Sequence, residues 1–360
     1  MHSPQTWPEF MSRVDNIGLP IMEAKSKYNR ELLQLEEQIA MQIQVQQSAQ
    51  NASVGGSRTL ITNSNIYQIV DEWFENKTQT EAYYGKIGDW DVSRVTDMSD
   101  LFEPSTGFGV GKSVVDGFNE DISAWDVSNV VYFDSFFNNQ TTFNQPLDSW
   151  DVSNGENFLY MFSDASSFNQ SLNSWNITNA TRISLMFHNA TAFNGNISDW
   201  DVSNVFDFSN MFDGATSFNQ DLSSWDIGNS ANDPDLPGFG LSSMFKGASS
   251  FNQNISGWVI PNNILTTYKM FENATSFDQN LSSWNIASLV SGTGGATDMF
   301  KGITLSTANY SALLIGWAAQ TNTNGVTLNG GNSQYSAGAA ADARALMQGQ
   351  SWVITDGGQA

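Results

Sequence analysis

Large apolar residues recur along this chain with a fixed period of 25 residues. One unit reads roughly F-N-Q-x-L-x-x-W-D-V-S-N-V-x-x-x-x-x-M-F-x-x-A, and it is clearest from Phe193 to Phe218. Self-similarity at one fixed period of this length is typical of a stacked-repeat fold, in which each unit buries its apolar face against its neighbours. The pattern predicts a solenoid that presents one long surface instead of a single deep pocket.

A tryptophan marks each unit. Five tryptophans stand 25 residues apart, and three more carry similar flanking residues: Trp90, Trp125, Trp150, Trp175, Trp200, Trp225, Trp258 and Trp284. Additional residues interrupt the period between Phe102 and Phe118 and between Trp225 and Met244, and such insertions map to loops. We expect eight rungs whose tryptophans form a continuous structural core.

The spacing within one unit predicts a strand followed by a helix. Leu147, Trp150 and Val152 have the L-x-x-L-x-L spacing of a leucine-rich repeat strand. The Ser-Asn pair that follows supplies side-chain acceptors for a helix start. The next apolar residues share an i, i+3, i+6, i+7 pattern on one helical face: Val205, Phe208, Met211 and Phe212. The expected fold class is therefore an α/β repeat solenoid with a parallel sheet and short helices.

Turn residues recur at two further positions of the unit. We expect each short helix to end at a residue that accepts a left-handed backbone: Gly214, Gly247, Asn189 or Asn273. Asparagine then recurs in the returning loop: Asn119, Asn144, Asn169, Asn194, Asn219 and Asn252. An asparagine inside a turn can satisfy the backbone of its own and of the neighbouring rung, so we interpret this column as structural.

The phrase W-D-V-S-N-V…M-F-x-G-A-x-S-F-N-Q-x-L-S-S-W, found at Trp200 to Trp225 and at Leu241 to Trp258, resembles the BspA-like leucine-rich repeat surface proteins. The resemblance covers about residues 65–360. The helix predicted at Ile66 to Phe74 is similar to the family's opening segment, and Ala308 to Trp317 with Trp352 to Gly358 to its closing module. The resemblance implies surface-displayed binding or adhesion without known catalysis.

Residues 1–50 lie outside the resemblance. From about Met22 to Ala49 they contain good helix formers without Gly or Pro, which predicts a long helix. Its short heptad seam is the expected assembly or anchor site: Tyr28, Leu32, Leu35 and Ile39. The seam predicts docking onto a larger protein assembly or a homo-oligomer, for which a trimer is attractive; an exposed helix without a partner is the plainer alternative.

The expected organisation has five parts. An anchor or oligomerisation segment at 1–50 and a linker at 51–62 precede a capping helix at 63–80, the repeats at 81–303 and a C-terminal capping module at 304–360. The opening Met1-His2-Ser3-Pro4 has no cationic stretch and no apolar run of a secretion signal. A surface-type repeat made without an export signal favours a phage virion structural or host-recognition protein. A bacterial cell-surface adhesin is the alternative, and a carbohydrate-acting enzyme is the second alternative.

Charge and composition narrow the partners. The formal net charge is −23, and residues 81–303 contain 26 acids and 7 bases, which gives 7 − 26 = −19. This charge excludes nucleic acid as a partner, and no apolar run predicts membrane insertion. The chain has no cysteine, hence no disulfide and no cysteine-ligated zinc. We expect no cofactor, and either a host-surface glycan or a protein as ligand.

No catalytic residue is predicted. Carboxylates follow most tryptophans and are weak calcium candidates, although turn capping is the plainer interpretation: Asp91, Asp126, Asp151, Asp201 and Asp226. His188 lies at a variable turn position, and Gly107 to Ser113 lacks the first glycine of a phosphate-binding loop. Ligand recognition is expected from the variable residues between the framework positions and from the Glu103–Gly117 and Gly228–Gly238 loops.

Overall fold

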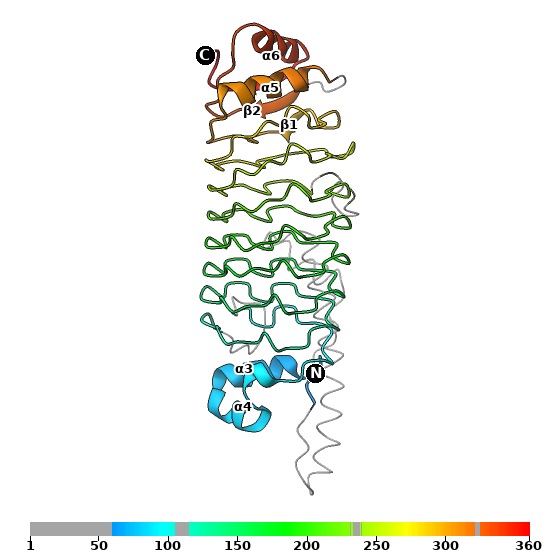
Figure 1. Ribbon diagram of the computed structural model, residues 1–360, viewed down its shortest axis with the longest axis vertical. Coiled ribbons are helices and arrows are strands. Elements are labelled where there is room, and N and C mark those ends of the chain that lie inside the picture. Colours follow the sequence, from blue (N-terminus) through cyan, green and yellow to red (C-terminus); the bar gives the residue numbers. More distant parts are fainter. Residues whose placement is uncertain (1–59, 105–114, 231, 233–237, 239, 321–324) are drawn as a thin grey trace, which may run out of the picture.

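The computed structural model describes residues 60–104, 115–230, 232, 238, 240–320 and 325–360. Their repeated part is a column of coils stacked one upon another, with helices at both ends (Figure 1). The predicted anchor residues Tyr28, Leu32, Leu35 and Ile39 and most of the predicted linker lie outside the described residues.

Two helices close the N-terminal end of the column. The predicted single capping helix is a pair, α3 (Ile66–Glu75) and α4 (Lys77–Tyr84), followed by a 3-10 turn at Ile87–Asp89. The chain divides at Asn76, whose side chain accepts from the N–H of Gln79 and so caps α4. Near the start of α3, Asn63 Oδ1 accepts the N–H of Thr96 at 2.8 Å, so the cap supplies a bond to the first coil.

The C-terminal end continues the stack with regular elements. Strand β1 (Gly292–Ala296) belongs to the last coil and is followed by α5 (Thr307–Ala318), β2 (Val326–Asn329), α6 (Ala339–Gly349) and β3 (Val353–Thr355). The strands form a parallel sheet in the order β1-β2-β3. A buried polar contact ties this module together, because Asp356 accepts from Arg344 Nε at 2.8 Å and from the Tyr310 hydroxyl at 2.9 Å.

The short helix predicted in each unit is wrong. In the described part of residues 90–304 there is no α-helix, although Val205, Phe208, Met211 and Phe212 are all buried as their spacing required. A helix needs each N–H to donate four residues back. Here Phe208, Phe212 and Gly214 donate instead to carbonyls of the next coil, at 2.7–2.9 Å.

Residues with a left-handed backbone allow this segment to direct its N–H groups to the next coil. The backbone φ is positive at all four predicted positions, Gly214, Gly247, Asn189 and Asn273, as the sequence indicated. A second left-handed residue lies four positions earlier, for example Asn210 with φ 54° before Gly214. Two left-handed residues in one segment exclude a helix there, which is why the burial pattern was right and the secondary structure wrong.

The predicted strand is also displaced along the unit. At Leu147, Trp150 and Val152 the chain forms two turns, with Trp150 N–H donating to Leu147 O and Gly155 N–H to Val152 O. The parallel bridges lie in the segment where we expected the helix, and they join five successive coils: Asp97, Tyr132, Asn157, Arg182 and Asp207. The segment that contains the M-F pair therefore forms the ladder of hydrogen bonds between coils.

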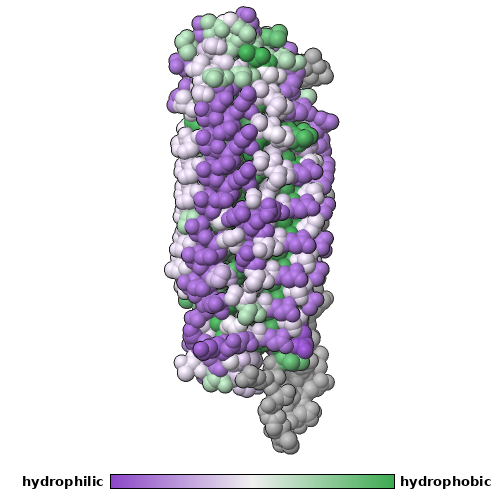
Figure 2. Space-filling view, in the orientation of Figure 1, coloured by the Kyte–Doolittle hydropathy of each residue, from purple (hydrophilic) through white to green (hydrophobic). Residues whose placement is uncertain are grey.

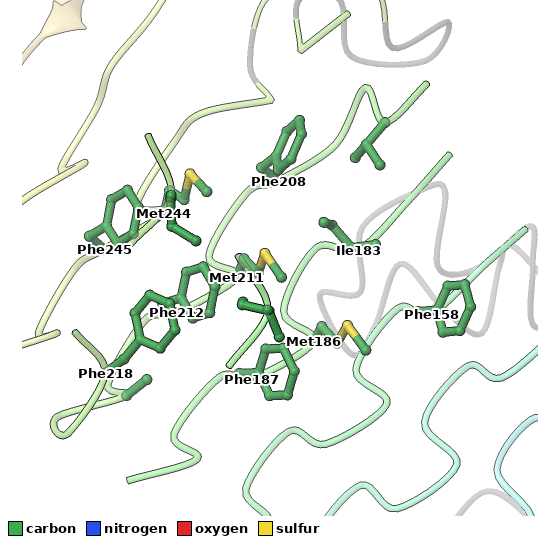
Figure 3. Packing of buried hydrophobic residues seen from close by; sticks show 14 of the residues in the cluster. Phe158, Ile183, Met186, Phe187, Phe208, Met211, Phe212, Phe218, Met244 and Phe245 are labelled. Carbon is green, nitrogen blue, oxygen red and sulfur yellow. The ribbon is translucent and has the colours of Figure 1, made fainter. Parts of the chain in front are cut away.

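The core consists of aromatic columns. All eight predicted tryptophans are buried, and stacked neighbours such as Trp175 and Trp200 have ring centroids 6.3–6.5 Å apart. Each indole N–H from Trp125 onward donates to a carbonyl of the preceding coil at 2.7–3.3 Å. Figure 3 shows neighbouring rows, with Met186, Met211 and Met244 in one and Phe187, Phe212 and Phe245 in the next. No coil could bury these rings alone.

Candidate functional site

The segments that carry the inter-coil ladder form one surface, here called the ladder face. It comprises the outward side chains of equivalent segments: 96–103, 131–138, 156–163, 181–188, 206–213, 240–246, 265–272 and 294–301. The backbone there is fixed by bonds such as Phe133 N–H to Asn157 O at 2.9 Å and Phe137 N–H to Met161 O at 2.8 Å. Side chains on this face therefore stand on a rigid frame.

Within the described part of residues 90–303, aromatic side chains reach solvent only on this face. Among the described residues from 90 to 303, four aromatic side chains are not buried, and all four belong to the ladder face: Tyr132, Tyr160, Phe206 and Tyr268. Tyr132 is 42% exposed and Tyr268 38% exposed, against at most 4% for the tryptophans of the core. Partial burial and then the nearby carboxylate of Glu156 raise the pKa of Tyr132, so its hydroxyl stays neutral.

From residue 113 to residue 303 the basic residues lie on the same face. Between residues 113 and 303 the sequence has four bases, and all of them occupy ladder-face positions: Arg182, Lys246, Lys269 and Lys301. Lys246 Nζ lies 2.9 Å from Asp213, and Lys301 Nζ lies 2.9 Å from Glu272. The hydrogen bond that Lys269 donates to Tyr268, and then the nearby Glu272 carboxylate, raise the pKa of Lys269.

Two of these cations also lie over aromatic rings. The Arg182 guanidinium is 5.2 Å from the ring centroid of Phe206 in the next coil, and Lys269 Nζ is 5.2 Å from that of Tyr268. The attraction between a cation and the face of an aromatic ring helps to hold these long side chains in place. The ladder face thus presents tyrosines and an arginine, which are among the residue types that dominate binding energies at interfaces.

Elsewhere the surface repeats from coil to coil, and Figure 2 shows hydrophilic columns along the stack. One column is an asparagine ladder: Asn144 N–H donates to Asn119 Oδ1 at 2.9 Å, and Asn169 N–H donates to Asn144 Oδ1 at 2.9 Å. The ladder passes through Asn252 to Asp278, whose Oδ1 accepts the N–H of Ser306 at 2.8 Å. The asparagines connect coils, which is the structural role that their spacing predicted.

The predicted aspartate column forms turns. Asp126 Oδ1 accepts the N–H of Ser128 at 3.1 Å, and the same contact, from the residue two positions on, recurs at each other member of the column: Asp91, Asp151, Asp201 and Asp226. Asn176 makes the equivalent bond to Thr178 N–H at 3.1 Å, so the turn does not need the charge. Among the described residues no three His, Cys, Asp or Glu side chains converge to hold a metal ion.

His188 meets a serine and an aspartate, but not in the arrangement of a catalytic triad. Ser163 Oγ lies 3.4 Å and Asp164 Oδ2 lies 3.7 Å from the same ring nitrogen, Nδ1. A relay requires the nucleophile on one nitrogen and the carboxylate on the other. The hydrogen bond with His188 and then that with Asn189 hold the pKa of Asp164 below its usual range, which favours the carboxylate as a fixed acceptor.

The two insertion loops lie partly outside the described residues. At the end of the first loop Gln140 Oε1 accepts the N–H groups of Gly117 and Phe118 at 3.0 and 2.8 Å, and its Nε2 donates to Phe102 O. Gln140 is fully buried and closes the gap that the insertion leaves in the stack. The expectation that these loops take part in recognition stays a prediction.

The sequence predicted recognition by variable residues between the framework positions, but it did not identify those of the ladder face by number. A usable signal was present, because the stretch between the valine and the M-F pair of each unit varies where the rest repeats: V-Y-F-D-S at 131–135 and T-R-I-S-L at 181–185. Those positions were assigned to a helix, whose outward face would have spread them differently.

The stacked coils and their repeated sequence define a repeat-containing protein. The family model described as "Mycoplasma protein of unknown function, DUF285" matches residues 69–196, 174–236 and 238–312, and the chain belongs to this family. No curated protein matches the chain. Within the described residues, none of the helices combines the length and the apolar character needed to cross a bilayer.

Proposed function

We propose that the chain is a non-enzymatic binding protein of the BspA-like leucine-rich repeat type, displayed at a surface, with the ladder face as its contact surface. One observation carries the proposal: every exposed or half-buried aromatic side chain described from 90 to 303, and every base from 113 to 303, occupies that face. The repeats carry a formal charge of −19, so bases are scarce there, and their location on one face sets that face apart from the rest of the surface.

A solenoid of eight rungs explains the family match and the stacking together. Its supports are the 25-residue phrase, the indole bonds between coils such as Trp175 Nε1 to Leu147 O at 2.8 Å, and the parallel bridges. Such a stack provides a long face of equivalent positions, suited to binding an extended partner.

A binding role is favoured over catalysis by the uniformity of the carboxylates. A glycosidase needs two carboxyl groups in different environments a fixed distance apart. The aspartates of the column share one turn contact, and hydrogen bonds from the serine two residues on lower the pKa of Asp91, Asp151 and Asp201 alike. None of these three is thereby set up as a proton donor at neutral pH.

The test is binding of the fluorescently labelled full chain to bacterial and animal cell surfaces, measured by flow cytometry. We expect a variant carrying Tyr132→Ala and Tyr268→Ala to lose most of the binding, because exposed tyrosines dominate contact energies. Tyr83→Ala is the matched control, since Tyr83 is 54% exposed but lies on α4. Equal binding by the ladder-face variant and the control would contradict the assignment of the face.

If the chain is displayed on a phage particle, it should be recovered from a different fraction than if it is displayed on a bacterial envelope. Mass spectrometry of purified particles from the source culture should find the chain together with capsid and tail proteins in the first case. Recovery from envelope fractions alone would assign the protein to the cell surface and reject the virion setting, and the ladder-face experiment stays valid in both.

A further inference from the structure

The ligand class can be inferred from how the aromatic side chains are distributed along the ladder face. Tyr132 and Tyr160 lie in adjacent coils, Phe206 lies two coils further on, and Tyr268 a further two coils on. Five coil-to-coil steps separate the coils of Tyr132 and Tyr268, which is roughly 24 Å at the spacing of paired strands. A partner that touches all four rings must therefore be extended along the stack.

The rings are separated by polar side chains. Asn157 lies between the coils of Tyr132 and Arg182, and Asn210 and Ser209 follow Phe206 on its coil. A protein interface has a contiguous apolar centre with a polar rim, whereas here the rings stand apart from one another among polar and charged side chains, with Arg182 over Phe206 and Lys269 over Tyr268. Such a surface suits a ligand that is itself apolar on one side and rich in hydroxyl groups at its edges, as a pyranose ring is.

The charges of the face argue against an anionic polymer. Lys246 and Lys301 are committed to Asp213 and Glu272 at 2.9 Å, and Arg182 lies over Phe206. No row of uncommitted cations is left among these bases, while the chain as a whole carries −23. An anionic ligand would have to break these pairs and approach a molecule of like charge.

We infer that the ladder face binds a linear, uncharged glycan lying along the stack, whose sugar rings pack on Tyr132, Tyr160, Phe206 and Tyr268. Side-chain amides between the rings donate hydrogen bonds to the sugar hydroxyl groups and accept from them, and the carboxylates accept from them. This inference rests on the proposed function, because it assigns a ligand to the same surface.

The experiment is isothermal titration calorimetry of the full chain with cellohexaose, chitohexaose and maltohexaose, and with polygalacturonate as the anionic comparison. We expect one of the neutral hexasaccharides to bind, with little change between low and high salt. Tyr132→Ala and Tyr268→Ala should each weaken it by about tenfold, which corresponds to about 1.4 kcal/mol. Tyr83→Ala should leave it unchanged, and melting curves of all variants verify the fold.

The outcomes separate the two proposals. Binding of polygalacturonate alone, weakened by salt, would overturn the inference of an uncharged ligand. If no hexasaccharide binds, yet a protein partner is captured from the cell surface and lost in the Tyr132 and Tyr268 variants, the glycan is wrong and the ladder face remains the contact surface. If neither variant alters any binding, both proposals fail.

Discussion

The indole N–H of Trp317 donates to the carbonyl oxygen of Leu281 at 3.1 Å. Trp317 lies on helix α5, outside the repeats, yet it makes the same bond to the preceding coil as Trp284 makes to Ile255 O at 3.2 Å. The C-terminal module therefore closes the stack by reproducing the contact of a coil with a different secondary structure. A capping unit of this kind shields the last apolar face from solvent.

Removing one ring from the middle of the tryptophan column should be costly. Trp175 is 2% exposed, and we expect Trp175→Ala to lower the free energy of unfolding by about 3–5 kcal/mol, the range for deleting a buried large aromatic. Trp175→Phe keeps a ring but removes one of the two donors to the carbonyl of Leu147, which still accepts from Trp150 N–H, so it should cost only about 0.5–1.5 kcal/mol. Chemical denaturation measures both, and a loss under about 1 kcal/mol for the alanine variant would contradict the role of this column.

The asparagine ladder can be tested by replacing one asparagine with aspartate, the residue that stands at this position in the coil of Asp278. Asn194 Oδ1 accepts from Asn219 N–H and from Gln220 Nε2, each at 2.9 Å. Asn194→Ala should cost about 0.5–1.5 kcal/mol, whereas Asn194→Asp keeps the acceptor, as Asp278 does in its own coil. Thermal melting should rank the aspartate variant nearer to the parent chain, and the reverse order would show that the side-chain oxygen is not what matters.

Calcium should not change the stability. Each aspartate of the column already uses an oxygen to accept a backbone N–H, and Asn176 replaces one of them without loss of the turn. We expect equal melting midpoints in EDTA and in millimolar calcium. A rise in the midpoint with calcium that disappears in an Asp126→Asn, Asp151→Asn variant would establish a metal site.

Acid should destabilise the protein. Hydrogen bonds from serines lower the pKa of Asp91, Asp121, Asp151, Asp201 and Asp221 in the folded chain. The unfolded chain then binds protons at higher pH than the folded one, so the stabilising effect is present above the ordinary aspartate pKa of about 3.9 and is lost as the pH falls below it.

The measurement is the melting temperature from pH 8 to pH 2.5. It should stay nearly level to about pH 5 and fall below about pH 4. Combining Ser93→Ala, Ser153→Ala and Ser203→Ala should flatten this fall, since those hydroxyls contribute to the lowered pKa values. Acidification also reduces the repulsion among the acids, so a melting temperature that rises on acidification would show that repulsion dominates.

Substitution of Asp356, which lies in the buried contact of the C-terminal module, should destabilise the protein. The Asp356 side chain is 2% exposed and accepts from both Arg344 and Tyr310. Burial, followed by the nearby Asp356 carboxylate, raises the pKa of the Tyr310 hydroxyl, so it remains a donor. We expect Asp356→Ala to cost about 3–5 kcal/mol by leaving the Arg344 charge partly buried and unpaired. Hydrogen exchange should show the loss first in α5 and α6, and unchanged protection there would contradict it.

The sequence was sufficient for the parts of the fold that depend on burial. The tryptophan column, the asparagine column and the left-handed positions follow from side-chain size and turn chemistry, which a 25-residue period repeats in plain view. The assignment of strand and helix failed because Val205, Phe208 and Met211 have a helical spacing. The N–H groups of Phe208 and Phe212 nevertheless donate to carbonyls of the next coil, and no local pattern reports that choice.

The candidate site was harder to predict for the same reason. Tyr132, Arg182 and Tyr268 are far apart in sequence, and they share a face only because their segments carry the ladder. The triad-like group at His188 has both its serine and its aspartate at the same ring nitrogen, and the P-loop-like segment Gly107 to Ser113 lies outside the described residues. Variation between equivalent positions was the informative signal, and its meaning depended on knowing which positions face outward.

The bond from Gly214 N–H to Lys246 O spans 32 residues, whereas the equivalent bond from Asn189 N–H to Asp213 O spans 24, and both measure 2.7 Å. The column thus keeps this bond although eight more residues separate the two bonded groups. A foreign epitope or affinity sequence inserted between Asn229 and Gly238 should therefore be carried without disturbing the neighbouring coils, which makes this molecule a scaffold for presenting peptides at a fixed height along a rigid rod.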